Sequence, residues 1–250
     1  MTQNQPESLS GRTLRERTLR GTRFISCDLS EVVVRGSDVA RMEIDSPWLM
    51  EEGGRLVVNG VDVVPLVEAE LNRRFPGRER RTAGDPDGLR SAWAAVEASW
   101  AATLERAVAM PAGTVDATVD GEWSLAQTLR HLVMATDVWL GRAILQRERP
   151  YHPAGLPNDD GDSEAYDASD FAADVPSFEE VLEARAHRQA MVRGFLANVT
   201  PQDLEAQRRN PHSADHEETV LSCLHTILNE EWEHHRYAVR DLDSIAARPR

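Results

Sequence analysis

Apolar residues recur along the first part of the chain at a spacing that neither a helix nor a strand has. They fall at every fifth position: Leu14, Leu19, Phe24, Leu29, Val34, Val39 and Ile44. An α-helix would space them about 3.6 residues apart and a strand two apart. A short period that never slips indicates a coiled solenoid, in which each repeat packs on its neighbours. The alternative is an irregular strand region in which this spacing arises by chance.

The same segment, RTLRE RTLRG TRFIS CDLSE VVVRG SDVAR MEIDS, resembles pentapeptide-repeat proteins. The resemblance implies a short right-handed β-helix over residues 11–46, with fewer than two turns. The small residues that this family prefers two places before each apolar centre are only partly present. Thr22, Cys27 and Ser37 fit that preference, whereas Arg12, Arg17 and Met42 depart from it. So short a solenoid cannot cover its own ends, so we expect it to cap another part of the chain.

Residues 47–83 are predicted to form a connector. Asn59-Gly60 lies between β-branched apolar runs, which is a strong signal for a β-hairpin. Pro65 suits the first turn of a helix, and Pro76-Gly77 would end that helix. We therefore expect a hairpin followed by one helix.

Four longer segments show the apolar period of a helix, at about residues 89–108, 125–146, 177–198 and 219–246. Ser124 with Gln127, and Ser177 with Glu180, have the spacing of a capping box. Four such helices predict a four-helix bundle over residues 84–250 and a mainly α protein. The acidic connection over residues 147–176 is longer than an up-down bundle with short loops would need.

The last of these helices carries two pairs of candidate metal ligands, Glu230 with His234 and Glu231 with His235. Residues four apart lie on one face of a helix, so each pair can chelate one divalent ion. The apolar stripe of this helix, followed in steps of four and three, passes through positions 231 and 235. We therefore expect Glu231 and His235 to face the core, with Glu230 and His234 on its flank.

A third candidate ligand is His131, a polar residue on a mostly apolar face of the second helix. A bundle core can bring His131 beside Glu231 and His235. Two imidazoles and one carboxylate suit zinc, nickel, iron or manganese. The alternative is a core without metal, in which the three residues satisfy one another through hydrogen bonds.

The composition narrows the range of partners. The formal net charge of −14 at pH 7 opposes binding to nucleic acid and to acidic membrane surfaces. The sequence shows no signal peptide and no apolar run of about 18 residues that would span a membrane. The two cysteines, Cys27 and Cys223, lie far apart and predict no disulfide framework. We expect a soluble cytoplasmic protein.

Two stretches, LRHLVMATDVW and NEEWEHHRYAVRDL, resemble the DinB-like (damage-inducible) family of four-helix-bundle metalloproteins, over roughly residues 88–246. In that family one histidine of the second helix and two histidines four apart on the last helix hold a divalent metal. His131 matches the first of these and His235 the last, while Glu231 stands where the family has its middle histidine. The resemblance therefore implies a metal site of His131, Glu231 and His235, which departs from the family at one ligand.

The resemblance also implies chemistry. Some members are transferases or isomerases that use low-molecular-weight thiols such as mycothiol, and others have no known activity. We therefore expect a metal-dependent enzyme for a small-molecule substrate, in which the metal activates a thiol or water. Glu230, His234 and Asp137 are candidate proton carriers, and Tyr151 with His152 is a candidate lid. The catalytic residues themselves stay open.

A second hypothesis belongs to another class of function. The bundle would be stabilised by metal without being catalytic, and the pentapeptide segment would be a protein-interaction module. The resemblance is compatible with a homodimer. The fusion of the two segments resembles an actinobacterial arrangement, which fits the use of arginine for all 28 basic residues.

Overall fold

The computed structural model describes residues 8–51, 53–157, 166–172, 174–213 and 215–248. The chain divides by compactness into two units, Met1–Asp45 and Ser46–Arg250, and each unit is described by itself. The finer division at residues 46 and 83 stays a prediction. Residues 158–165 of the acidic connection lie outside the described residues.

The backbone of the first unit repeats every five residues. The angle φ is positive at Gly11, Glu16, Gly21, Ser26, Glu31, Gly36 and Arg41. Every second turn is closed by a backbone hydrogen bond of 3.0–3.2 Å. The first of these bonds joins Arg12 N to Leu9 O, and the last joins Met42 N to Val39 O. Strands are not assigned among the described residues of this unit, so the β-helix that the pentapeptide resemblance implied is not shown.

The apolar residues of this repeat are only half buried. Their exposed fractions run from 48% at Leu29 to 56% at Leu14. In a solenoid the side chains of one coil are covered by the coils on either side, and so short a segment offers few of them. The apolar pattern of the first unit therefore does not make a closed core.

The expected hairpin and helix follow at the start of the second unit. Strands β1 (Val57–Val58) and β2 (Val61–Asp62) pair antiparallel. Asn59 and Gly60 both have positive φ, of 50° and 85°, as a type I′ turn requires. Helix α1 (Val64–Arg74) begins with a proline in its first turn and is followed by the short helix η1 (Arg78–Thr82).

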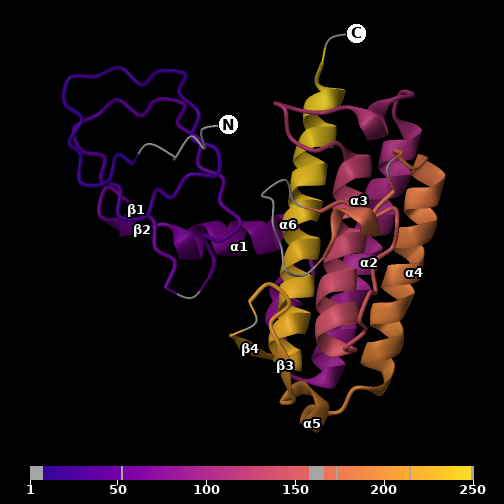
Figure 1. Ribbon diagram of the computed structural model, residues 1–250. Coiled ribbons are helices and arrows are strands. Elements are labelled where there is room, and N and C mark those ends of the chain that lie inside the picture. The colour runs from indigo at the N-terminus through magenta and orange to yellow at the C-terminus, as the bar shows by residue number, and fades with distance from the viewer. Residues whose placement is uncertain (1–7, 52, 158–165, 173, 214, 249–250) are drawn as a thin grey trace. The chain divides into compact units, whose positions relative to one another are not determined.

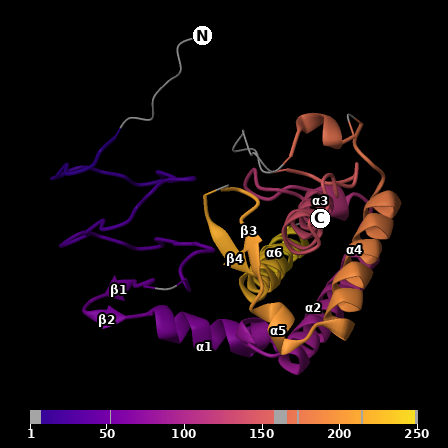
Figure 2. The same cartoon turned by 60° about the horizontal axis from the view of Figure 1, so that its bottom comes forward.

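Four long helices make the body of the second unit. They are α2 (Pro86–Ala109), α3 (Leu125–Thr136), α4 (Phe178–Asn198) and α6 (Val220–Ala246). Helix α6 contacts both α2 and α3, and α4 contacts the same two helices on the other side (Figures 1 and 2). The mainly helical fold expected from the sequence is confirmed. Shorter elements join the helices: η2 (Thr114–Asp116), η3 (Asp137–Ile144), η4 (Ala168–Asp170), α5 (Pro201–Leu204), β3 (Gln207–Arg209) and β4 (Glu217–Thr219).

Local signals in the sequence set where two of these helices begin. The Ser124 side chain accepts a hydrogen bond from Gln127 N, and the Gln127 side chain accepts one from Ser124 N. Ser177 and Glu180 form the same reciprocal pair at the start of α4. Helix α3 continues directly into the π-helix η3, a form that is often found at functional sites.

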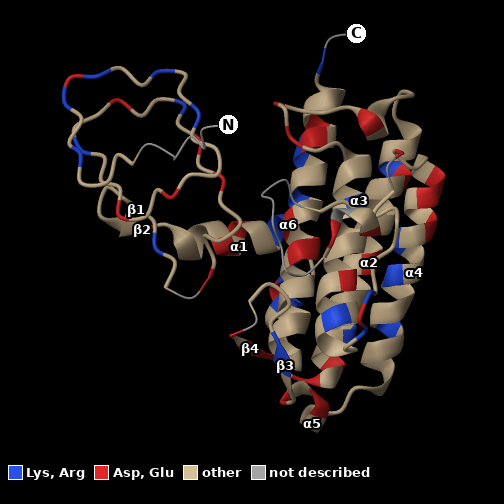
Figure 3. Ribbon diagram, in the orientation of Figure 1, with Lys and Arg blue, Asp and Glu red and all other residues tan. Residues whose placement is uncertain are grey.

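The core of the bundle is large and aromatic. Trp93, Trp100 and Trp232 are each exposed by 2% or less, and they pack among leucines of all four helices. Acidic and basic residues both occur along α4 and α6 (Figure 3). Among the described residues no helix has the length and apolar character needed to span a membrane.

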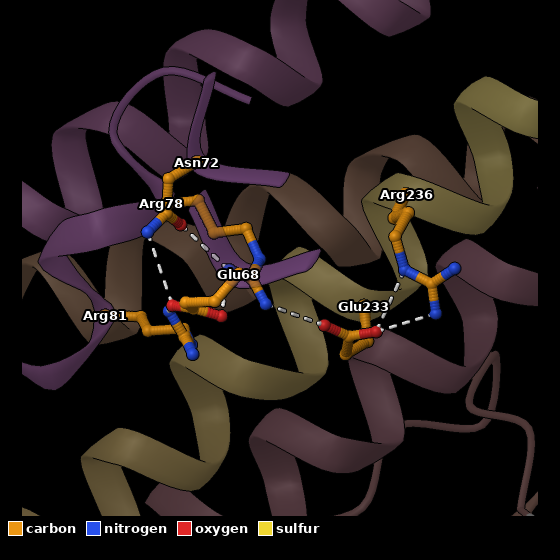
Figure 4. A network of polar contacts seen from close by, with 6 residues as sticks. All are labelled: Glu68, Asn72, Arg78, Arg81, Glu233 and Arg236. Atoms are coloured by element: carbon orange, nitrogen blue, oxygen red, sulfur yellow. Dashed lines mark hydrogen bonds and ion pairs between the residues drawn. The ribbon is translucent and has the colours of Figure 1, made fainter. Parts of the chain in front are cut away.

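A network of charges joins α1 and η1 to α6 (Figure 4). Arg78, only 1% exposed, donates from Nη1 to Glu68 at 3.0 Å and from Nη2 to Glu233 of α6 at 3.4 Å. Arg81 reaches the other oxygen of Glu68 at 2.7 Å, and Arg236 contacts Glu233 at 2.8 Å. Because each carboxylate is shared by two arginines, the network holds the connector against α6.

Replacing the central arginine should therefore loosen this attachment. Arg78→Met leaves Glu68 and Glu233 each short of one partner, and we expect the free energy of unfolding to fall by about 2–3 kcal/mol. Urea denaturation measures it. The matched control is Arg73→Met, which removes an exposed ion pair with Glu70 and should leave the free energy of unfolding nearly unchanged. Equal losses in the two variants would contradict a structural role for the network.

Candidate metal centre

His131 of α3 meets Glu230 and His234 of α6. Glu230 Oε2 lies 3.1 Å from His131 Nε2 and 3.3 Å from His234 Nε2. The two imidazole rings have their centroids 4.7 Å apart. One ligand atom from each residue can be chosen so that all three lie within 4.8 Å of one another, which is close enough to hold one metal ion.

Helix geometry produces this meeting. Glu230 and His234 are one turn apart on α6, so their side chains lie on one face. The capping box at Ser124 starts α3 seven residues before His131, which places that histidine in the middle of the helix. Because α3 packs on α6, His131 faces the Glu230–His234 pair.

The centre is buried on the α3 side and open on the α6 side. The side chain of His131 is 5% exposed, that of His234 is 18% and that of Glu230 is 34%. An ion held by these three donors would therefore keep coordination positions that a molecule from solvent can reach. Sites with such open positions are typical of catalysis rather than of a purely structural metal.

The charge state of the group favours cation binding. Burial acts to raise the pKa of Glu230, but its hydrogen bonds with His131 and His234 outweigh burial and bring this pKa below its ordinary value. For His234 burial lowers the pKa, although the hydrogen bond with Glu230 acts to raise it. An ionised carboxylate beside a neutral imidazole is the protonation state that a divalent metal requires.

Aromatic side chains line the centre. The Trp123 ring lies 4.9 Å from that of His131 and is stacked at 6.1 Å on that of His234, centroid to centroid. Tyr237 meets His234 edge to face at 6.1 Å, and the guanidinium of Arg236 lies 4.4 Å above the Tyr237 ring. These rings fix the orientation of the imidazoles.

Glu231 and His235, the two α6 ligands expected from the sequence, lie elsewhere. Both are buried as expected, with exposed fractions of 1% and 5%. Glu231 forms an ion pair with Arg185 of α4. His235 Nε2 lies 2.8 Å from Thr103 Oγ1 and 3.2 Å from the carbonyl oxygen of Ser99, both on α2. Of the three expected ligands, only His131 belongs to the group that can hold a metal among the described residues.

The difference has a simple physical reason. Consecutive residues of a helix point about 100° apart, so Glu230 and Glu231 face different neighbours. Helix α6 lies against both α2 and α3. The most buried stripe of α6, with Glu231 and His235, faces α2 and α4, whereas the flank with Glu230 and His234 faces α3.

The other candidate residues also have defined partners. Asp137 is fully buried and accepts hydrogen bonds from Arg188 at 2.8 Å and from the His152 backbone N at 2.9 Å. Burial raises the pKa of Asp137, although Arg188 opposes that shift. The Tyr151 hydroxyl accepts a hydrogen bond from Arg142 at 3.3 Å. These contacts hold the loop of Tyr151 and His152 on η3, and a role of this loop as a lid stays a prediction.

The sequence interpretation missed two residues that matter here, Trp123 and Arg185. Trp123 precedes the N-cap of α3, and no period along the chain marks it. Arg185 did have a signal, because it falls on the buried stripe of α4. The residues of that stripe are Val181, Arg185, Arg188, Val192 and Leu196.

The ion pair of Arg185 and Glu231 generates a stability prediction. Arg185→Met would leave the Glu231 carboxylate buried and unpaired, so we expect the free energy of unfolding to fall by about 3–5 kcal/mol. The double variant Arg185→Met/Glu231→Leu removes both charges and should recover most of that loss. Urea denaturation of the set measures both values. A double variant as unstable as the single one would contradict the ion pair as the cause.

The two thiols should differ sharply in reactivity. Cys27 is exposed, whereas Cys223 is fully buried and burial raises the pKa of its thiol to about 12. Since the thiolate is the reactive form, Ellman's reagent at pH 8 should label wild-type protein at Cys27 alone. Cys27→Ser should then stay unlabelled until denaturant is added. Rapid labelling of native Cys27→Ser would show that Cys223 is accessible.

Comparison with known proteins adds one finding. Neither the curated proteins nor the solved structures contain a match to this chain. The model of the DinB superfamily matches residues 68–238, from α1 to the later part of α6. That range includes His131, Glu230 and His234. Because this match covers more than half of the chain, the chain belongs to the DinB superfamily.

Proposed function

We propose that this protein is a divalent-metal-dependent enzyme that acts on a small molecule, with His131, Glu230 and His234 as the metal ligands. One observation carries the proposal. Two imidazole nitrogens and a carboxylate oxygen converge within 4.8 Å, and the carboxylate side stays open to solvent. This donor set fits zinc, nickel, iron or manganese.

The chemistry of such a site depends on what reaches its open side. When bound, a divalent ion supplies a Lewis acid that lowers the pKa of a coordinated thiol or water. Glu230 holds both imidazoles in place, and Trp123 covers one side of the histidines. The group contains no cysteine among the described residues, and the Cys223 thiol is buried and protonated.

We therefore infer that the thiol comes from solution, since neither the group nor the buried Cys223 offers one. Membership of the DinB superfamily, some members of which use low-molecular-weight thiols, supports a thiol of the mycothiol type as cosubstrate. The reaction that we propose is accordingly a thiol-dependent transfer or isomerisation of a small molecule.

Metal content tests the ligand assignment. We expect purified wild-type protein to hold nearly one divalent ion per chain by inductively coupled plasma mass spectrometry. His131→Ala, Glu230→Gln and His234→Ala should each lose most of it, because each removes one of three ligands. His235→Gln is a matched control from the same helix and should keep its metal.

The control variant decides which face of α6 holds the metal. Loss of metal in His235→Gln and retention in His234→Ala, with all variants folded by circular dichroism, would overturn the assignment. Absence of metal from every protein, after incubation with zinc, nickel, iron and manganese, would overturn the metalloenzyme proposal itself.

A spectroscopic measurement tests the thiol. Cobalt(II)-loaded protein should gain a thiolate-to-metal absorption band in the near ultraviolet when N-acetylcysteine is added. Cys27→Ser/Cys223→Ser should behave in the same way, because the sulfur comes from solution. A loaded protein whose spectrum N-acetylcysteine leaves unchanged would contradict a thiol at the metal.

A second candidate function is supported by the first unit. Its half-exposed apolar side chains, such as Leu14 and Phe24, would suit a protein-interaction module attached to a metal-stabilised bundle. Thiol binding separates the two functions, because both keep a metal in the bundle. Deletion of residues 1–45 should leave thiol binding unchanged if the bundle is the enzyme, whereas a bundle that is only stabilised by metal should bind no thiol with or without these residues.

A further inference from the structure

Five arginines are buried among the described residues of the second unit, and four of them have acidic partners. Arg78 and Arg81 pair with Glu68, Arg185 pairs with Glu231, and Arg188 pairs with Asp137. The fifth is Arg130, which is 8% exposed. It forms no ion pair with any acidic side chain in the described part of the chain.

The surroundings of Arg130 hold its guanidinium in place without neutralising it. Its Nε donates to the carbonyl oxygen of Ala154 at 3.1 Å. The backbone N of Leu156 donates back to the carbonyl oxygen of Arg130 at 3.1 Å, so the loop is fixed on α3. Nη1 and Nη2 form no hydrogen bond within the described part of the chain, and neither atom is fully buried. Both therefore keep access to solvent.

Such an arrangement differs from that of the other buried arginines. Most charged side chains that are largely buried in proteins are paired or bind a ligand, whereas the terminal nitrogens of Arg130 have no acidic partner in the described part of the chain. The other four buried arginines show that this chain does pair such charges elsewhere.

We propose that Arg130 is the recognition residue of an anion-binding site, which takes the carboxylate of a small molecule end-on between Nη1 and Nη2. With Nε already bound to Ala154, the two terminal nitrogens are the edge that remains. They are parallel donors whose spacing matches that of the two oxygens of a carboxylate. Guanidinium groups bind carboxylates through two such parallel hydrogen bonds.

The charge balance favours a carboxylate over a phosphate. One guanidinium neutralises one negative charge. The other four buried arginines are already paired with acidic side chains, so the second charge of a phosphate would find no counter-charge among them.

Small carboxylates test the proposal on the full-length protein. Sodium acetate and sodium succinate are the probes, at constant ionic strength with sodium chloride as reference, and the readout is the midpoint of thermal unfolding. A ligand that binds only folded protein raises this midpoint, by an amount that increases with its concentration relative to its Kd. We expect both probes to stabilise the wild type, with an affinity about tenfold to a hundredfold lower in Arg130→Met.

Two further variants separate recognition from structure. Arg130→Lys keeps the charge but loses the bidentate edge, so its affinity for the probes should fall between those of the wild type and Arg130→Met. Without any probe, Arg130→Met should be only slightly less stable than the wild type, because it removes one hydrogen bond to Ala154 and no ion pair. Arg188→Met, which leaves Asp137 unpaired, should be clearly less stable.

Three results would overturn the inference. The first is a wild type whose midpoint no carboxylate raises above the chloride reference. The second is an equal response in Arg130→Met, which would indicate an adventitious ion only. The third is a loss of stability in Arg130→Met as large as in Arg188→Met. The inference goes beyond the proposed function. Because the measurement is made on metal-free and metal-loaded protein, failure of the anion site does not affect the metal assignment, and failure of the metal assignment does not affect the anion site.

Discussion

The rotation of α6 about its own axis is the constraint on which the rest of the bundle depends. The buried contact between Arg185 and Glu231 fixes that rotation, because a carboxylate exposed by only 1% has to keep its partner. With Glu231 turned toward α4, the helix presents Glu230 and His234 to α3. The ion pair with α4 therefore positions the metal centre from the opposite side of the helix.

Much of the fold could be predicted from local chemistry. The capping boxes at Ser124 and Ser177 and the Asn59-Gly60 turn depend on residues within four positions of one another, and each is found where expected. His131 was also identified, since a histidine on an apolar face stands out in any sequence. These features need no knowledge of which helix lies beside which.

The remainder depended on contacts between distant segments. The choice between Glu230 and Glu231 requires knowing that α3 packs on the flank of α6, and periodicity along α6 alone does not contain that information. The first unit shows the same limit. Its period of five predicted the backbone repeat, whereas the half-exposed state of Leu14 and its equivalents depends on how many coils surround them.

The doubled pattern on α6, two glutamates followed four residues later by two histidines, has a consequence for how the protein can change. A single-residue deletion before Glu230 would turn the later part of the helix by about 100° and bring Glu231 and His235 into the places of Glu230 and His234. A chemically identical Glu–His pair would then face His131, but Arg185 would lose its buried partner. The donor atoms of the centre are in this sense held in duplicate, and the ion pair with α4 selects which copy faces α3.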